Sequence, residues 1–123
     1  QNKRAKPSQD VEVGRGPDPV AAMKQSVAAG EIPKAIAIGQ HSLSQDITNL
    51  ALRLLLADLH QQEGQLDEAE VLWRQALYLD SNCQLALEQL FLLAELRGNL
   101  VKAEILRQRL LRLANDPNQT VTA

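Results

Sequence analysis

The sequence is poor in cysteine and aromatic residues, and each shortage excludes a class of structure. Cys83 is the single cysteine among 123 residues, so the chain cannot form an internal disulfide or a cysteine-based metal site. A lone cysteine favours a reducing compartment, and we expect a cytoplasmic location. Aromatic residues make up only 2%, which leaves leucine and alanine to build the core and favours helices over strands.

Long apolar runs and a strong net charge are also missing. No run approaches the roughly 20 apolar residues that a membrane-spanning helix needs, so we predict no membrane insertion. The net charge of −2 lacks the basic excess typical of nucleic-acid binding, and we predict no nucleic-acid partner.

Residues 1–16 have no apolar period and carry four basic against two acidic residues. We interpret them as a disordered linker or tail. A basic arm for nucleic acid is the alternative, although such arms carry a denser charge. Met23 is the only methionine, so the sequence does not start at an initiator residue, and we interpret it as part of a longer protein.

The residues that are present repeat with a period of 34. The residues that keep this register are Gly30, Gly64 and Gly98; Ala35, Ala69 and Ala103; Ile38, Leu72 and Leu106; and Leu43, Leu77 and Leu111. A fixed period of this length is typical of stacked helical repeats. The predicted fold class is therefore all-α, an α-solenoid of three stacked antiparallel helix pairs with six helices.

Start and stop signals divide residues 17–114 into repeats at about 17–49, 50–83 and 84–114. Asp18-Pro19 begins the first helix, Asp46 is the expected N-cap of the third with Ile47 as its first apolar residue, and Asn82 is expected to begin the fifth. Residues 115–123 are predicted to form a flexible tail. Gly39, inside the second helix, is expected to allow a close approach of a neighbouring helix.

The middle repeat resembles the tetratricopeptide repeat. Its matching residues are Ala57, Gly64, Ala69, Trp73 and Ala76, with Ser81 where that family often has proline. The outer repeats match less well, because Gly39 and Arg107 replace the aromatic residue and Phe91 replaces a small one. The resemblance covers about residues 16–117 and implies a protein-interaction module.

A narrower resemblance involves residues 74–113, which are similar to tetratricopeptide segments that follow chemoreceptor glutamate methyltransferases of bacterial signalling systems. It implies a regulatory or scaffolding appendage, with residues 1–16 as the linker from an upstream catalytic domain. The alternative is an assembly component of a bacterial envelope, pilus or secretion complex, where similar repeats also occur.

The residues themselves indicate no catalytic, cofactor or metal site. His41 and His60 lie in different repeats without partners at metal-ligand spacing. The acidic run Asp67, Glu68 and Glu70 is interpreted as a solvated helix start. Trp73 and Tyr78 are expected to pack in the core and at a turn, so no enzyme is predicted for these 123 residues.

The resemblance places ligand contacts on the first helix of each pair. The predicted partner-binding residues are Lys24, Leu54, Asp58, Gln61, Gln62, Glu88, Leu92, Glu95 and Leu96. This set has too few basic residues for the family's clamp on carboxylate tails. It favours a peptide or helix with apolar anchors and some Lys or Arg. The simpler alternative is that these are ordinary solvated helix residues.

A second candidate surface is the end of the stack. The sixth helix is expected to pack through Leu100, Leu106 and other apolar residues on one side. Val101, Ile105 and Leu111 lie outside that set, and no seventh helix follows to cover them. They are predicted to contact a second copy, giving a homodimer through the last helix, or the rest of the parent protein, or another partner.

Overall fold

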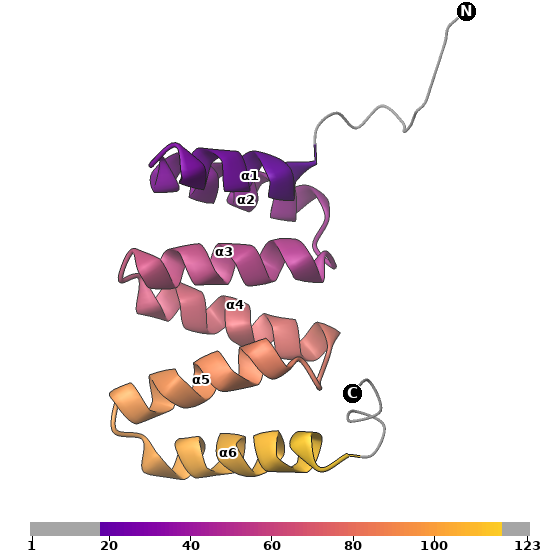
Figure 1. The fold of residues 1–123 in the computed structure, drawn as a ribbon, viewed down its shortest axis with the longest axis vertical. Helices are drawn as coiled ribbons and strands as arrows, with labels where there is room; N and C mark the ends of the chain where they lie inside the picture. Colours follow the sequence, from indigo (N-terminus) through magenta and orange to yellow (C-terminus); the bar gives the residue numbers. More distant parts are fainter. Residues whose placement is uncertain (1–17, 117–123) are drawn as a thin grey trace, which may run out of the picture.

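A computed structural model describes residues 18–116, which leaves the linker predicted at 1–16 and most of the tail predicted at 115–123 outside the described residues. Six helices and no strands occupy this range: α1 (Pro19–Ala28), α2 (Ile32–Gln45), α3 (Leu50–Gln62), α4 (Leu66–Leu79), α5 (Gln84–Leu96) and α6 (Leu100–Ala114). The six helices follow one another along the long axis of the molecule, from α1 at one end to α6 at the other (Figure 1).

Each helix packs mainly on its sequence neighbours. The closest pairs are α1 with α2, α3 with α4, and α5 with α6, and the links between these pairs are made by α2 with α3 and by α4 with α5. This serial arrangement, without closure into a bundle, confirms the predicted solenoid of three antiparallel helix pairs.

Glycine closes the turn inside each helix pair. Gly30, Gly64 and Gly98 have φ angles of 79°, 76° and 73°, the left-handed region that side chains disfavour. A Cβ at any of them would meet nothing within 4 Å, so the backbone angle, and not lack of space, requires glycine.

Helix starts agree with the sequence prediction at α1 and differ at α3. The Asp18 carboxylate accepts a hydrogen bond from the Val20 backbone N–H at 3.0 Å. The predicted cap of α3 by Asp46 is wrong, because Asn49 accepts from the Leu52 N–H instead. Asp46 closes a turn after α2, in which its carbonyl accepts from the Asn49 N–H, and Ile47 is left exposed outside the helix.

The fifth helix also begins later than predicted. Asn82 lies in a turn, where its backbone N–H donates to Asp80 Oδ1, and α5 starts at Gln84 with Cys83 as N-cap. Cys83 is buried.

Where the two helices of each repeat cross, one large side chain lies between them. In the middle repeat this is Trp73 of α4, opposite Ala57 of α3, and both are buried. In the first repeat the sizes are exchanged. Met23 of α1 is large and Gly39 of α2 is small, and a Cβ on Gly39 would lie 2.6 Å from Met23 Cε. The close approach predicted at Gly39 is confirmed, and the exchange explains why this repeat departs from the aromatic pattern.

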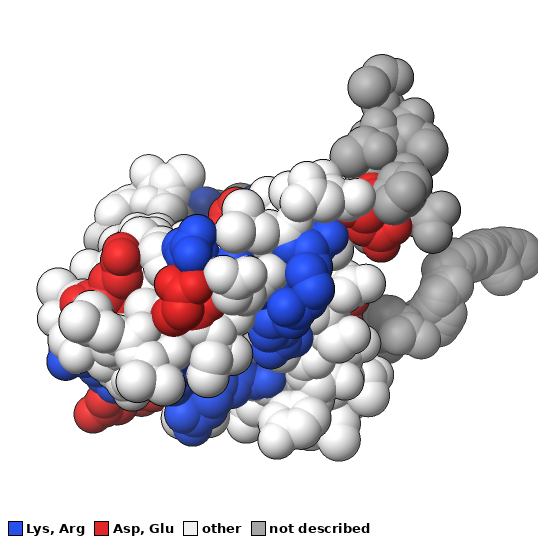
Figure 2. Space-filling view, turned by 90° about the horizontal axis from the view of Figure 1, so that it is seen from below, with Lys and Arg blue, Asp and Glu red and all other residues white. Residues whose placement is uncertain are grey.

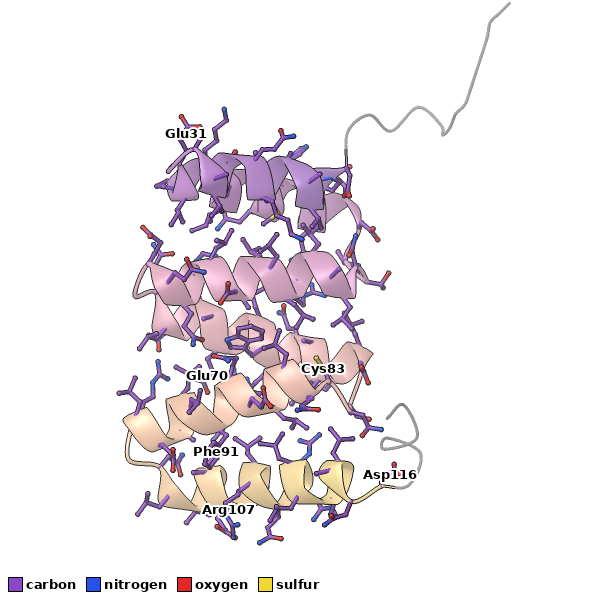
Figure 3. All side chains as sticks on the ribbon, viewed as in Figure 1. Glu31, Glu70, Cys83, Phe91, Arg107 and Asp116 are labelled. Atoms are coloured by element: carbon purple, nitrogen blue, oxygen red, sulfur yellow. The ribbon has the colours of Figure 1, made fainter. Side chains whose placement is uncertain are left out.

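In the third repeat the residues at the same two positions are Phe91 of α5 and Arg107 of α6. Phe91 lies between the two helices, while Arg107 is on the side of α6 that faces away from α5 (Figure 3). The large apolar residue again comes from the first helix of the pair, as in the first repeat.

Two apolar residues were assigned to packing and are exposed. Tyr78 has 90% of its side chain accessible, and Leu100 at the start of α6 is also exposed. Both lie in the outermost turns of their helices. His60, by contrast, is buried with its Nδ1 2.6 Å from Gln65 Oε1, and this contact gives it a structural role. None of the helices within residues 18–116 has the length and apolar content to cross a bilayer.

Candidate functional site

The predicted partner-binding residues all lie on α1, α3 and α5, the first helices of the three pairs. We call the surface that they form the α1/α3/α5 surface. Lys24, Asp58, Gln62 and Glu95 are exposed on it, together with Leu92 and Leu96, and Leu54, Gln61 and Glu88 are half-buried.

A hydrogen-bond relay through Gln61 joins α3 to α4 and to α5. The indole Nε1–H of Trp73 donates to Gln61 Oε1 at 2.8 Å, and Gln61 Nε2 donates to Gln89 Oε1 at 2.7 Å. Gln61 therefore satisfies the polar atom of the buried tryptophan and connects the second repeat to the third. Its position on the surface is fixed by packing, and its amide is already engaged on both sides.

Two of the three acidic residues of this surface, Asp58 and Glu88, accept hydrogen bonds from neighbours on their own helices. Gln62 Nε2 donates to Asp58 Oδ2 at 2.8 Å, and Gln84 Nε2 donates to Glu88 Oε2 at 2.9 Å. Each amide orients the carboxylate without neutralising it. Both carboxylates keep their negative charge available to a cationic group.

Leucines on α5 form an exposed apolar stripe beside these acids. Leu85, Leu92 and Leu96 follow a seven- and four-residue spacing that places them on one side of the helix. Leu92 and Leu96 are 52% and 69% accessible. This stripe, with Glu88 and Glu95 next to it, is the most apolar part of the predicted binding surface.

The exposure of Val101 and Ile105 has a different cause from the one expected. Residues that share a position in the 34-residue repeat define a column, and the column of Ile105 contains Ala37 and Val71, both exposed inside the stack. The column of Val101 contains Pro33 and Asp67, also exposed. These two columns therefore face solvent in every repeat, whether or not another repeat follows.

Leu111 does belong to the end face. Its column contains Leu43, which is buried, and Leu77, which is half-buried, because the next repeat covers them. On α6 nothing among the described residues covers it, and Leu111 is 43% accessible. The predicted surface is thus two surfaces: an outer column with Val101 and Ile105, and an end face with Leu111.

Charged residues make much of the end face polar. Arg107 stands in the column of Trp73 and binds Glu104 through two hydrogen bonds, Nε to Oε1 at 3.0 Å and Nη2 to Oε2 at 2.8 Å. Hydrogen bonds from Arg107, and also from Gln108, lower the pKa of Glu104 to about 2. Seen from this end, lysine and arginine side chains form separate patches between uncharged areas (Figure 2). A terminal repeat with polar residues in place of core residues acts as a cap.

An ion-pair network between the second and third repeats was not predicted from the sequence. Asp67 binds Arg97 at 2.7 Å, and Glu70 binds Lys102 at 2.9 Å, Arg97 and Arg74. Glu70 lies between α4 and α5, beside the turn that leads to α6 (Figure 3). The hydrogen bond from Lys102 is the main cause that holds the pKa of Glu70 below its ordinary value of 4.5.

The interpretation of these acids as a solvated helix start is wrong for Glu70, whose side chain is 14% exposed, while the Asp67 side chain is 90% exposed although it pairs with Arg97. Arg74 is a local partner of Glu70 at i,i+4, whereas Arg97 and Lys102 lie 27 and 32 residues from Glu70, so no local charge pattern reveals these two partners. Only the 34-residue register, which brings the start of α4 next to the α5–α6 turn, could have indicated the pairing.

Comparison with known families agrees with this architecture. A tetratricopeptide repeat profile matches residues 26–90, more than half of the chain. The chain belongs to the tetratricopeptide repeat family. The match begins within α1 and ends within α5, so it spans the complete middle repeat and parts of both outer ones. Among curated proteins, no sequence matches this one.

Members of the tetratricopeptide repeat family are in general protein-interaction modules and not catalytic domains. Within residues 18–116, no three His, Cys, Asp or Glu side chains are placed to hold a metal ion.

Proposed function

We propose that this chain binds a peptide or helix of a partner protein through the α1/α3/α5 surface. The observation that carries the proposal is the exposed stripe of Leu85, Leu92 and Leu96 beside Glu88 and Glu95. Apolar side chains of the partner would cover the leucines, and its Lys or Arg residues would approach the carboxylates.

The two kinds of contact contribute differently to binding. Burying an exposed leucine is favourable by roughly 1.5 to 3 kcal/mol, so the stripe supplies most of the affinity. Glu95 is exposed at the edge of the stripe, where a charge mainly changes the association rate and the choice of partner. Gln61 contributes through the relay to Trp73 and Gln89, which keeps the second and third repeats in register.

The sequence resemblance of residues 74–113 supports a finer proposal, in which this module is a cytoplasmic regulatory appendage of a signalling methyltransferase. The alternative is an assembly component of an envelope, pilus or secretion complex. The sequence of the parent gene distinguishes the two. A methyltransferase domain upstream would support the first, and a signal peptide or membrane anchor the second.

The binding proposal is tested with a labelled amphipathic helical peptide that has a leucine face flanked by lysines. Fluorescence anisotropy is measured with the wild type, with the double variant Glu88→Lys/Glu95→Lys, and with Glu31→Lys as a control for a charge reversal far from the stripe. We expect the double variant to bind this peptide at least about tenfold more weakly and to prefer a glutamate-flanked version. Equal affinity of the double variant and the Glu31→Lys control would remove this surface from consideration.

A further inference from the structure

A hollow of about 480 Å³ lies on the other side of the molecule, between α2 and α4. Leu43 and Ile47 line it from the α2 side, and Val71 and Leu72 line it from α4. Its floor is formed by α3 side chains that lie roughly opposite to the partner-binding columns of that helix, because each residue turns an α-helix by about 100°. We call this hollow the α2/α4 groove, and it is separate from the α1/α3/α5 surface.

The floor of the α2/α4 groove contains a buried cation without an acidic partner. Arg53 is 9% accessible, and no carboxylate within residues 18–116 forms a salt bridge with it. Its Nη1 donates to the Ile47 carbonyl, while its buried Nε has no hydrogen-bond partner. Buried polar groups in proteins are nearly always paired, and an unpaired one calls for an explanation.

The bond to Ile47 explains only part of this arrangement. It holds the turn between α2 and α3, for which one guanidinium nitrogen is enough. Removal from water is unfavourable for the charged form, and burial lowers the pKa of Arg53. An anion in the groove would offset this electrostatic cost, and a planar carboxylate suits a guanidinium best.

The two ends of the α2/α4 groove carry opposite charges. Arg53 lies in the first turn of α3, and Glu68 lies in the first turn of α4. Because α3 and α4 form an antiparallel pair, these two residues lie at opposite ends of the groove. An acidic group is therefore attracted to the end with Ile47 and Arg53 and repelled at the end with Glu68, with Val71 and Leu72 between them.

We propose that the α2/α4 groove is a second docking site, which binds a segment of a partner protein that has an acidic residue between apolar ones. The carboxylate accepts hydrogen bonds from Arg53, and the apolar side chains contact Leu43, Ile47 and Val71. The charge of this segment is opposite to that of the segment proposed for the α1/α3/α5 surface, so one chain can hold two different partners at once.

The test uses two blocked hexapeptides of alternating leucine and aspartate or leucine and asparagine, added to the ¹⁵N-labelled full chain. The Arg53 Nε–Hε resonance and the amides of Val71 and Ser44 report on the groove, while Leu92 and Glu95 report on the other surface. We expect the aspartate peptide to shift the groove resonances and to bind at least about tenfold more tightly than the asparagine peptide. Equal affinities, or shifts confined to Leu92 and Glu95, would overturn the proposal.

Three variants test the groove further. None of them removes Arg53, because its loss would also disturb the turn between α2 and α3. Glu68→Gln removes the repulsion and is expected to tighten binding of the aspartate peptide. Val71→Asp places a negative charge inside the groove and is expected to abolish that binding. Glu88→Lys changes the other surface, and we expect it to leave the groove shifts unaltered, so that a failure of one site is distinguishable from a failure of the other.

The chain itself offers a competing occupant in residues 10–13, which read Asp-Val-Glu-Val. The double variant Asp10→Asn/Glu12→Gln of the full chain distinguishes this case. If it shifts the Arg53 Nε–Hε resonance without added peptide, the groove is occupied by its own N-terminal segment, and the assignment to a partner protein is wrong. An unchanged Arg53 resonance supports the partner.

Discussion

Replacing Gln61 by methionine tests whether this residue serves packing or ligand binding. Methionine keeps the length of the side chain and removes the carbonyl that accepts from Trp73 Nε1. Trp73 is only 1% accessible, so water cannot readily take the place of the lost acceptor. An unsatisfied buried donor costs about 1–3 kcal/mol, and the bond from Gln61 to Gln89 is lost as well.

The expected result is that Gln61→Met lowers the free energy of unfolding by about 2 kcal/mol. Unfolding in urea is followed by circular dichroism and not by tryptophan fluorescence. Trp73 is the single tryptophan, and the double-mutant cycle described next also replaces it. In the Trp73→Phe background, which has no indole N–H, the same change is expected to cost less, with a coupling energy of about 1 kcal/mol. Additive effects within about 0.3 kcal/mol would show that the Trp73–Gln61 bond does not stabilise the fold.

Three further substitutions have defined outcomes. Gly39→Leu is expected to destabilise the fold by about 2 kcal/mol or more, because even a Cβ would clash with Met23 and Leu56; a neutral effect in urea unfolding would show that α1, α2 and α3 do not approach as described. Glu70→Gln is expected to cost about 1 kcal/mol at pH 7. Since the folded-state pKa lies below 4.5, that stabilisation exists above pH 4.5 and is lost as the pH falls through the folded-state pKa, below which the two proteins should converge; a difference that stays constant as the pH falls would contradict the ion-pair network. Ile105→Glu is expected to change the unfolding free energy by less than about 0.5 kcal/mol, because its column faces solvent in every repeat, and to abolish any dimer seen by sedimentation; a dimer that persists would exclude this column as its interface.

The period of 34 residues was enough to predict the architecture. Gly30, Gly64 and Gly98 occupy the three positions with positive φ, and the bounds of α4 and α6 agree with their sequence signals. These features were predictable because each depends on short-range physics, such as the backbone angle of a turn or the apolar face of one helix.

The details that sequence reasoning missed depend on contacts between repeats or on a choice between equivalent signals. Asp46 and Asn49 are both good N-caps, and only the turn geometry after α2 decides that Asn49 is used. Glu70 pairs with Arg74 on its own helix, but its other two partners, Arg97 and Lys102, belong to the following repeat and lie beyond any local charge pattern. Gln61 has the sequence position of a ligand contact, while its two hydrogen bonds are visible only once α4 and α5 are in place.

The α2/α4 groove could not be found from the sequence for the same reason. Arg53 reads as an ordinary helix arginine, and its burial results from the packing of α2 and α4 over α3. The exposure of Tyr78 was equally hidden, because an aromatic residue in a leucine-rich chain with only three aromatic residues suggests a packed position.

Serial stacking of the repeats is tested most directly by distances between spin labels at Lys24, Asp58 and Leu92, which are exposed and separated by 34 residues each. Cys83 is replaced by alanine so that only the chosen pairs carry labels. In a solenoid, the distance between positions 24 and 92 should be close to twice that between 24 and 58, and the 58–92 distance should equal the 24–58 distance. A 24–92 distance no longer than the 24–58 distance would mean that the helices close into a bundle, and would contradict the stacked arrangement on which both proposed binding surfaces depend.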